Sequence, residues 1–438
     1  MPASPGRRVA PFRTRRRVCL SLFGLAIAGA ARATPGRTSI TFRFNDADAT
    51  ELRAVLDRFE RANPDIAVTL QRVAWKDARD QLLREAAVGR GPDVVHIAFV
   101  WTRELARAGV LRAIDDLNVN QVLPIGDFVA ADLVREAGRT YGVPWTADTW
   151  AMVYRTDLLE QAGVPHLPSS WDELLAASAQ VKQKTGKYGF VFPGGSGSSG
   201  GMWFLANYYW WSHGVELVSG HADGSFSIGL DRAAIASAMQ YFKTFLAAGH
   251  APAAVVSYND AHDPAIMNGL AQGHQAIGIM PVNTYKQLLK MCADANPGRR
   301  VPLTSGLVPA GTRPGLTHVG GRTLAINANT KQAEASWKLI QYLNTPEVFA
   351  PPYYTSQLPA RKSLLKTVRF QPEEEGFARQ LADHTRSWGA YSEGPAPMGQ
   401  LWNATTRAFG SALSDQMPVD QAAGDLHRDV ERLVSAKK

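Results

Sequence analysis

Two patterns of apolar and polar positions follow one another along the first part of the chain. Residues 39–45 alternate apolar and polar side chains, as a half-buried strand does, whereas residues 48–63 carry apolar residues at helical spacing. A second strand-like segment covers residues 66–73, and residues 94–97 are apolar on both faces, as buried parallel strands are. Strands that alternate with helices in this way predict an α/β fold.

Polar and aromatic residues stand where each of these strands ends. Ligands of α/β sheets bind at the carboxyl ends of the strands, so residues at this edge are candidate binding residues. They are Asn45, Asp46, Trp75 and Trp101.

The stretch 145–154 has the aromatic and β-branched composition of a strand, but its centre is polar, with Thr146, Asp148 and Thr149. An unpaired carboxylate is costly to bury. We therefore expect this strand to leave one lobe and enter another, with its middle exposed beside a ligand. A new helix is expected to begin at Ser170, with Ser170 and Glu173 forming a capping box.

Residues 194–201 form a Gly/Ser run that contains both G-x-G-x-x-G and G-x-S-x-G. These motifs occur in dinucleotide sites and around serine nucleophiles, but a Gly/Ser run matches many patterns by chance. A flexible loop whose backbone lies near a ligand is the favoured interpretation. The following helix, residues 202–213, has aromatic residues on too wide an arc for one buried stripe, so part of them should face a ligand. One face carries Trp203 and Trp210 and another Asn207 and Trp211; the sequence does not choose between them, and Trp211 is taken as the binding candidate.

The first 33 residues have the features of an export signal. Seven arginines accompany an apolar run at residues 18–30, which is shorter than the roughly 20 residues that span a bilayer, and Ala31-Arg32-Ala33 fits a cleavage site. The segment T-R-R-R-V at residues 14–18 also fits a twin-arginine signal, so both export routes stay open. We expect a periplasmic protein.

The charge of the chain depends on this leader. The whole chain has 47 basic and 39 acidic residues, a net charge of +8. Without the leader's seven arginines, 40 basic and 39 acidic residues remain. Because the excess charge lies in the leader, a nucleic-acid partner is not expected. Only Cys292 is left of the two cysteines, so no intramolecular disulfide is expected.

Motifs of catalysis and metal binding are missing from the sequence. It contains no H-E-x-x-H, no C-x-x-C and no phosphate loop ending in Gly-Lys-Ser/Thr. We therefore expect no catalytic residues, no metal ligands and no cofactor. The 11 Trp and 12 Tyr exceed what a core needs, and aromatic residues often line recognition clefts.

Three ordered motifs carry a resemblance to a known family. They are Y-G-V-P at residues 141–144, Y-R-T-D-L-L-E-Q-A-G at 154–163 and P-S-S-W-D-E-L at 168–174. In this order they resemble the family 1 extracellular solute-binding proteins of ABC importers, the maltose-binding-protein-like group. The resemblance covers nearly all of the chain after the leader and is weak beyond Arg361.

The resemblance implies a type II periplasmic binding protein fold, an α/β fold of two discontinuous lobes joined by hinge segments. After the signal peptide, residues 1–33, lobe one takes residues 34–147 and 307–346, and lobe two takes 148–306 and 347–438. The chain is expected to cross between lobes near residues 147–148, 305–307 and 345–349. Closure over a ligand is expected because the ligand touches both lobes only in the closed form.

The implied function is the substrate-binding component of an ABC importer, a monomer that delivers a sugar or short oligosaccharide to a membrane permease. Alternatives are a binder of glycerol-3-phosphate or another phosphorylated polyol, a binder of quaternary amines, a sensor that feeds a membrane receptor, and a secreted carbohydrate-active enzyme. Aromatic rings stack on the apolar faces of sugars, and polar side chains pair with their hydroxyl groups. The candidate substrate-binding residues are Asn45, Asp46, Trp75, Trp101, Trp145, Asp148, Trp211, Asn283, Gly321, Arg322, Tyr354 and Arg361.

Overall fold

A computed structural model describes residues 36–45, 50–198, 200–295, 297–298, 300–349, 357–367 and 370–435. The leader and two candidate site residues, Asp46 and Tyr354, lie outside the described residues. None of the described helices is both long and apolar enough to span a membrane.

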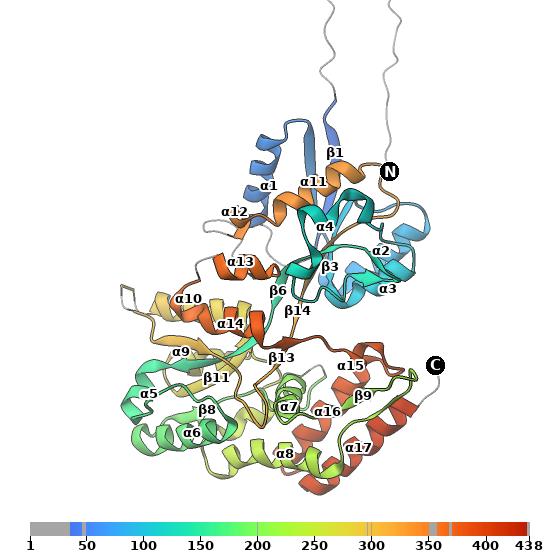
Figure 1. Ribbon diagram of the computed structural model, residues 1–438. Coiled ribbons are helices and arrows are strands. Elements are labelled where there is room, and N and C mark those ends of the chain that lie inside the picture. Colours follow the sequence, from blue (N-terminus) through green and yellow to red (C-terminus); the bar gives the residue numbers. More distant parts are fainter. Residues whose placement is uncertain are drawn as a thin grey trace, which may run out of the picture. The chain divides into compact units, whose positions relative to one another are not determined.

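Lobe one is built on a six-stranded sheet with the order β15-β6-β14-β3-β1-β2 (Figure 1). Strands β1, β2 and β3 are parallel, and β6, β14 and β15 are each antiparallel to the strands beside them. The strands are β1 (Thr38–Phe44), β2 (Ile66–Arg72), β3 (Val94–Ala98), β6 (Val143–Asp148), β14 (Gly320–Ile326) and β15 (Leu358–Pro359). The helices of this lobe are α1 (Thr50–Ala62), α2 (Trp75–Ala87), α3 (Thr102–Arg107), α4 (Val119–Val122), α11 (Ala333–Leu343), α12 (Pro346–Phe349) and α13 (Lys362–Thr367).

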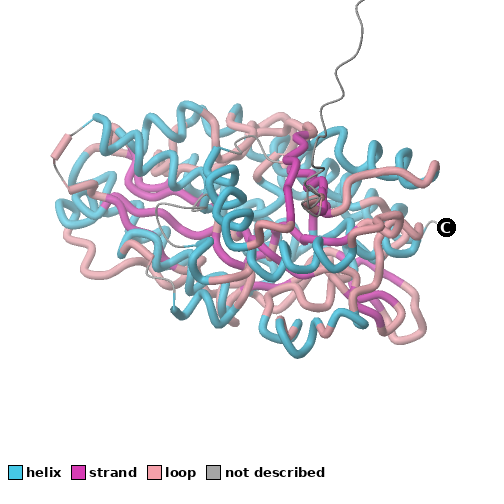
Figure 2. Tube along the Cα trace, turned by 90° about the horizontal axis from the view of Figure 1, so that it is seen from above, coloured by secondary structure: helices cyan, strands magenta, loops and turns pink. Residues whose placement is uncertain are grey.

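The core of lobe one follows the sequence pattern. The apolar positions of β1 and the helical stripe of α1, which includes Leu52, Leu56 and Phe59, are all buried, which confirms both predictions. Helix α11 comes from a distant part of the chain and contacts β1 and β14 (Figure 1). Seen from above, helices lie on both sides of the strands (Figure 2).

Lobe two is built on a four-stranded sheet with the order β12-β7-β11-β8. Its strands are β7 (Trp150–Arg155), β8 (Tyr188–Phe190), β11 (Gln275–Pro281) and β12 (Leu303–Gly306). Helices that belong to this lobe are α5 (Thr156–Ala162), α6 (Trp171–Thr185), α7 (Met202–Ser212), α8 (Arg232–Ala247), α9 (Pro264–Ala271), α10 (Val282–Ala295), α14 (Glu375–Asp383), α15 (Ala390–Glu393), α16 (Met398–Leu413) and α17 (Val419–Ser435).

Short strand pairs and 3-10 turns complete the fold. The pairs are β4 (Arg135–Glu136) with β5 (Arg139–Thr140), β9 (Val218–Gly220) with β10 (Phe226–Ile228), and β13 (Thr317–His318) with β16 (Thr385–Arg386). The 3-10 turns are η1 (Phe99–Trp101), η2 (Asp115–Leu117), η3 (Ile125–Asp127), η4 (Ala253–Ser257) and η5 (Pro372–Glu374).

Helix ends in lobe two match the sequence signals. Gly163 ends α5 with a left-handed φ of 75°, a conformation that glycine adopts without strain. The Ser170 hydroxyl caps α6 by accepting a hydrogen bond from the Glu173 amide at 3.2 Å. The Glu173 carboxylate bonds the amide and hydroxyl of Ser169 at 2.8 Å, one residue earlier than a capping box requires.

The chain changes sheets first at Thr149, between β6 and β7. The single expected strand is therefore two strands. The prediction of an exposed centre is wrong for Thr146 and Thr149, which are fully buried. The Thr149 hydroxyl is satisfied inside the protein, because it lies 2.7 Å from the Thr317 hydroxyl and donates to the His318 carbonyl at 3.1 Å.

The other two sheet changes lie later than the sequence boundaries place them. After β12 the chain stays with lobe two, where the amide of Val308 donates to the side chain of Gln380, and it joins the lobe-one sheet only at β14. Strand β15 also pairs with β6 in lobe one, so the segment after residue 346 has not yet left that lobe. These boundaries depend on partners far away in sequence.

Candidate functional site

Three of the predicted residues meet at the carboxyl edge of the lobe-one sheet. Trp75 begins α2 directly after β2, and Trp101 closes η1 directly after β3. Their indoles stack, with centroids 4.5 Å apart and planes inclined by 21°. The guanidinium carbon of Arg322, from β14, lies 4.1 Å from the centre of the Trp75 ring. All three side chains are partly exposed, and below they are called the Trp75–Trp101–Arg322 stack.

A glycine and a bulge shape the backbone that carries Arg322. Gly321 has a φ of 146°, and a Cβ at this position would overlap the Thr146 carbonyl oxygen and the ring of Phe99. The register between β14 and β6 shifts between Arg322 and Thr323. Bulges of this kind occur beside binding sites, where they redirect a side chain.

Asn45 and His96 connect strands β1 and β3 next to this edge. Asn45 is buried, and its side-chain amide donates to the His96 carbonyl, which ties the end of β1 to β3. His96 is fully buried and stacks on Phe44 at 4.6 Å. Burial, with a smaller contribution from the charge of Arg322, lowers the pKa of His96 well below its ordinary value. The ring is therefore neutral at neutral pH.

Trp145 has a packing role in place of the expected ligand contact. The side chain is fully buried, and its indole N–H donates to the Leu343 carbonyl at 2.7 Å. Its ring meets Phe44 and His96 edge-on. Five of the six residues of β6 are buried, so both faces of this strand are covered and the alternation does not single out an exposed position.

Asp148 ends β6 and is half-buried, opposite Gly320 in the sheet. Its charge, after the larger effect of burial, raises the pKa of Tyr208 in α7. Asp148 therefore lies at the change of sheets, close enough to lobe-two residues to act on them electrostatically.

Arg361 is held in an ion pair with Asp127. Its Nε donates to Asp127 at 2.8 Å, beside a β-bridge between Arg361 and Phe128. Burial acts to raise the pKa of Asp127, but hydrogen bonds from Ser363 and Arg361 bring it below its ordinary value. This contact gives Arg361 a structural function within lobe one.

In lobe two, Trp211 is buried and Asn283 is partly exposed. The Trp211 indole N–H donates to the Tyr391 hydroxyl at 3.4 Å, and Arg386 lies over its ring at 4.9 Å, so Trp211 also packs internally. Asn283 stands in the first turn of α10, just after β11, and its side-chain oxygen accepts the Thr284 amide at 2.8 Å. The partly exposed aromatic residues of α7 are instead Phe204 and Tyr209.

Trp402 is an aromatic candidate that the sequence reasoning did not select. It is partly exposed on α16, lies 5.9 Å from Trp203 in a parallel stack, and donates its indole N–H to the Gly200 carbonyl at 2.8 Å. It lies in the C-terminal region, where the family resemblance is weakest. Its helical spacing gave the only signal, and that signal does not separate a packing residue from a binding residue.

The Gly/Ser loop uses its backbone for internal contacts. The amide of Gly195 donates to the Tyr258 carbonyl at 2.9 Å, and that of Gly197 to the Asn259 side chain at 3.0 Å. A Cβ at Gly197 would overlap Asn259, so the glycines permit close packing. The loop amides described are thus engaged within the chain, which argues against a phosphate-binding loop.

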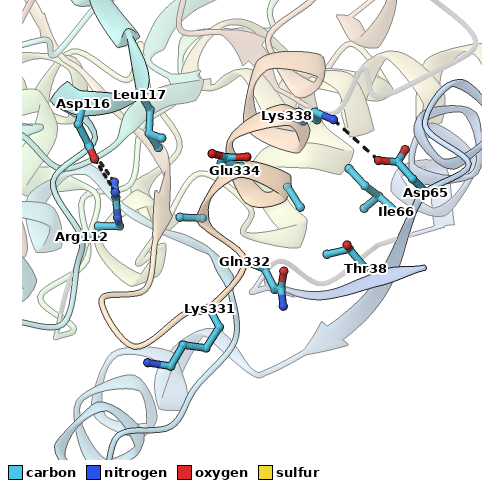
Figure 3. A pocket seen from close by; sticks show the side chains of 12 residues that line it. Thr38, Asp65, Ile66, Arg112, Asp116, Leu117, Lys331, Gln332, Glu334 and Lys338 are labelled. Carbon is cyan, nitrogen blue, oxygen red and sulfur yellow. Dashed lines mark hydrogen bonds and ion pairs between the residues drawn. The ribbon is translucent and has the colours of Figure 1, made fainter. Parts of the chain in front are cut away.

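A hollow of about 530 Å³ lies at the opposite, amino-terminal edge of β1 and β2, beside the start of α11 (Figure 3). It is lined by three basic and three acidic side chains: Arg112, Lys331, Lys338, Asp65, Asp116 and Glu334. Two ion pairs, Arg112–Asp116 and Lys338–Asp65, form between residues that line it (Figure 3). Its charges balance, and it contains none of the predicted site residues. Within the described part of the chain, no three His, Cys, Asp or Glu side chains are grouped to hold a metal ion.

Comparisons with known proteins agree on one family. The family model of the bacterial extracellular solute-binding proteins matches residues 45–348. A binding protein of Brucella abortus is 26% identical over 384 residues, which cover 82% of this chain and 89% of the relative. The maltodextrin-binding protein of Bacillus subtilis is 23% identical, with 94% of this chain and 95% of the relative covered.

Solved structures show the same fold. The sugar-binding protein MalE of Xanthomonas citri superposes with a TM-score of 0.73 at 21% identity, covering 91% of this chain and 98% of that one. The architecture is that of the two-lobe periplasmic binding proteins. Because the family model spans well over half of the sequence, this chain belongs to the bacterial extracellular solute-binding protein family.

Proposed function

We propose that this protein captures a sugar or short oligosaccharide in the periplasm and delivers it to the permease of an ABC importer. The observation that carries the proposal is the partly exposed Trp75–Trp101–Arg322 stack at the carboxyl edge of the lobe-one sheet. Indoles and a guanidinium offer apolar surface and hydrogen-bond donors together, which is what a sugar with apolar C–H faces and polar hydroxyls requires.

Relatives and the chain's topology support this proposal. Relatives include proteins named for maltotriose, lactose and maltodextrin. The two sheets are joined at Thr149, between β6 and β7, and before β14. A ligand that contacts both lobes binds the closed form more tightly than the open form and so favours it. In this proposal the permease recognises the closed form. The leader at residues 1–33 supports export.

Isothermal titration calorimetry of the purified protein tests the ligand class. The titrants are maltose, maltotriose and lactose, with glycerol-3-phosphate to represent phosphorylated polyols. We expect saturable binding of at least one sugar, and a rise in melting temperature, because a ligand that binds only the folded state stabilises it by about 2.7 kcal/mol at a hundredfold excess over Kd. If glycerol-3-phosphate binds and none of the sugars does, the ligand is a phosphorylated polyol and the proposed sugar is wrong.

Two further measurements separate the binding role from others. Sugar analysis after long incubation should find no cleavage products, whereas turnover would identify an enzyme. Deleting the gene should abolish cellular uptake of the sugar that the protein binds. Uptake that continues unchanged would contradict a role in import.

A further inference from the structure

Arg322 is presented by a specialised piece of backbone. It pairs with Ala98, the last residue of β3, so its side chain starts at the carboxyl edge where Trp75 and Trp101 stand. The bulge between Arg322 and Thr323 and the left-handed Gly321 lie on either side of it. Two backbone irregularities next to one arginine are unusual in a buried central strand, and they serve to aim a side chain.

Trp75 restrains the direction of that arginine. The guanidinium lies 4.1 Å from the indole ring, and Trp101 stacks on the same indole at 4.5 Å. Two neighbours at stacking distance already occupy the Trp75 ring. The Arg322 Nη1 also donates to the Gly321 carbonyl at 3.3 Å, which further restrains the group. A guanidinium is a planar fork of N–H donors that suits a pair of neighbouring oxygen atoms.

We infer that Arg322 is a specificity-determining residue that donates hydrogen bonds to two adjacent ligand oxygens, and that Trp75 is a positioning residue that holds its guanidinium. The inference rests on the proposed function, since the adjacent oxygens are those of a bound saccharide. It assigns Trp75 a contact with Arg322 in place of a stacking contact with a sugar ring.

A double-mutant cycle tests this division of roles. Affinity for the best saccharide of the panel is measured for wild type, Arg322→Gln, Trp75→Leu and the double variant. Arg322→Gln should weaken binding about tenfold or more, as expected for loss of hydrogen bonds from a charged donor. Trp75→Leu should weaken binding by several fold in the wild-type background and by less than about twofold when Arg322 is already glutamine.

Conservative and remote variants serve as controls. Trp75→Phe keeps an aromatic face for the guanidinium and should retain most of the affinity, which a merely structural loss would not explain. Lys182→Gln removes another cation–π contact, over Tyr188 at 4.5 Å in lobe two, and should leave binding unchanged. Melting curves without ligand show which variants are folded. If Trp75→Leu does not fold, Trp75→Phe takes its place in the cycle.

The outcomes are separable. Equal fold-losses from Trp75→Leu in both backgrounds would mean that Trp75 contacts the ligand itself and would overturn the inference. Unchanged affinity in Arg322→Gln would overturn it as well. A wild-type protein that binds no saccharide would overturn both the proposed function and this inference, whereas a sugar-binding wild type with an additive cycle overturns the inference alone.

Discussion

A buried histidine beside the change of sheets makes the stability of this protein depend on pH. His318 packs against Phe204, at 4.8 Å, and against Trp388, at 5.1 Å, and is 7% exposed. The Tyr208 hydroxyl lies 2.7 Å from its Nδ1. Burial lowers the pKa of His318 from its ordinary value of 6.5 to about 3. The ring is therefore neutral at neutral pH, and its tautomer decides which of the two groups donates the hydrogen bond.

The sign and size of the effect follow from this shift. Below about pH 6.5 the unfolded chain binds a proton at this histidine and the folded chain does not, so stability falls as the pH falls. One pKa unit corresponds to about 1.4 kcal/mol, so between about pH 8 and pH 5 the loss is about 2 kcal/mol. The loss continues until the pH reaches the folded-state pKa of about 3.

A matched variant isolates this contribution. The double substitution Tyr208→Phe with His318→Phe removes both partners of the hydrogen bond and keeps aromatic rings packed against Phe204 and Trp388, which limits its own cost. Urea unfolding followed by circular dichroism at about pH 8 and pH 5 gives the free energy of unfolding for both proteins. Other histidines, including the buried His96, titrate in both proteins and cancel in the difference.

The wild type should lose about 2 kcal/mol more than the double variant on going to the lower pH. Equal losses in the two proteins would refute the reasoning, because His318 would then bind its proton in the folded state as readily as in the unfolded state. A larger loss in the variant would refute it too.

Two further substitutions test the lobe-one framework. Gly321→Ala should lower the free energy of unfolding by at least roughly 1–3 kcal/mol, because its left-handed φ and the overlap with Thr146 both oppose a Cβ; a urea midpoint equal to that of the wild type would contradict this. Trp145→Ala should cost about 3–5 kcal/mol, because it empties a fully buried site and removes the bond to Leu343. Calorimetry on the folded fraction should find its sugar affinity unchanged, and a selective loss of affinity with normal stability would return Trp145 to the binding site.

Part of the candidate site could be predicted from the sequence because it follows a local rule. Trp75 and Trp101 were selected because they stand just after strands of a parallel sheet, and they stack in the structure. Trp145 was selected because its strand was expected to pass a ligand, and Trp211 because the aromatic residues of its helix cover too wide an arc for one buried stripe, but both are buried. Periodicity identifies the face of a strand or helix but not what covers that face, so it could not separate these two pairs.

The positions of the sheet changes show the same limit. The first was predicted near residues 147–148 from the polar centre of one stretch, and the sheets change at Thr149. The second and third were placed at residues 305–307 and 345–349, but β14 and β15 hold later segments in the lobe-one sheet. No local pattern announces these pairings, because each depends on a strand more than a hundred residues away.

The sequence by itself determined the alternation of strands and helices in the first part of the chain, the helix ends at Gly163 and Ser170, and the family, because these follow from spacing, capping and ordered motifs within short segments. Only the tertiary structure decided which aromatic side chains remain partly exposed, how Arg322 meets Trp75, and where the chain passes from one sheet to the other. The physical reason is that burial and hydrogen-bond partners come from segments distant in sequence, which meet only when the chain is folded.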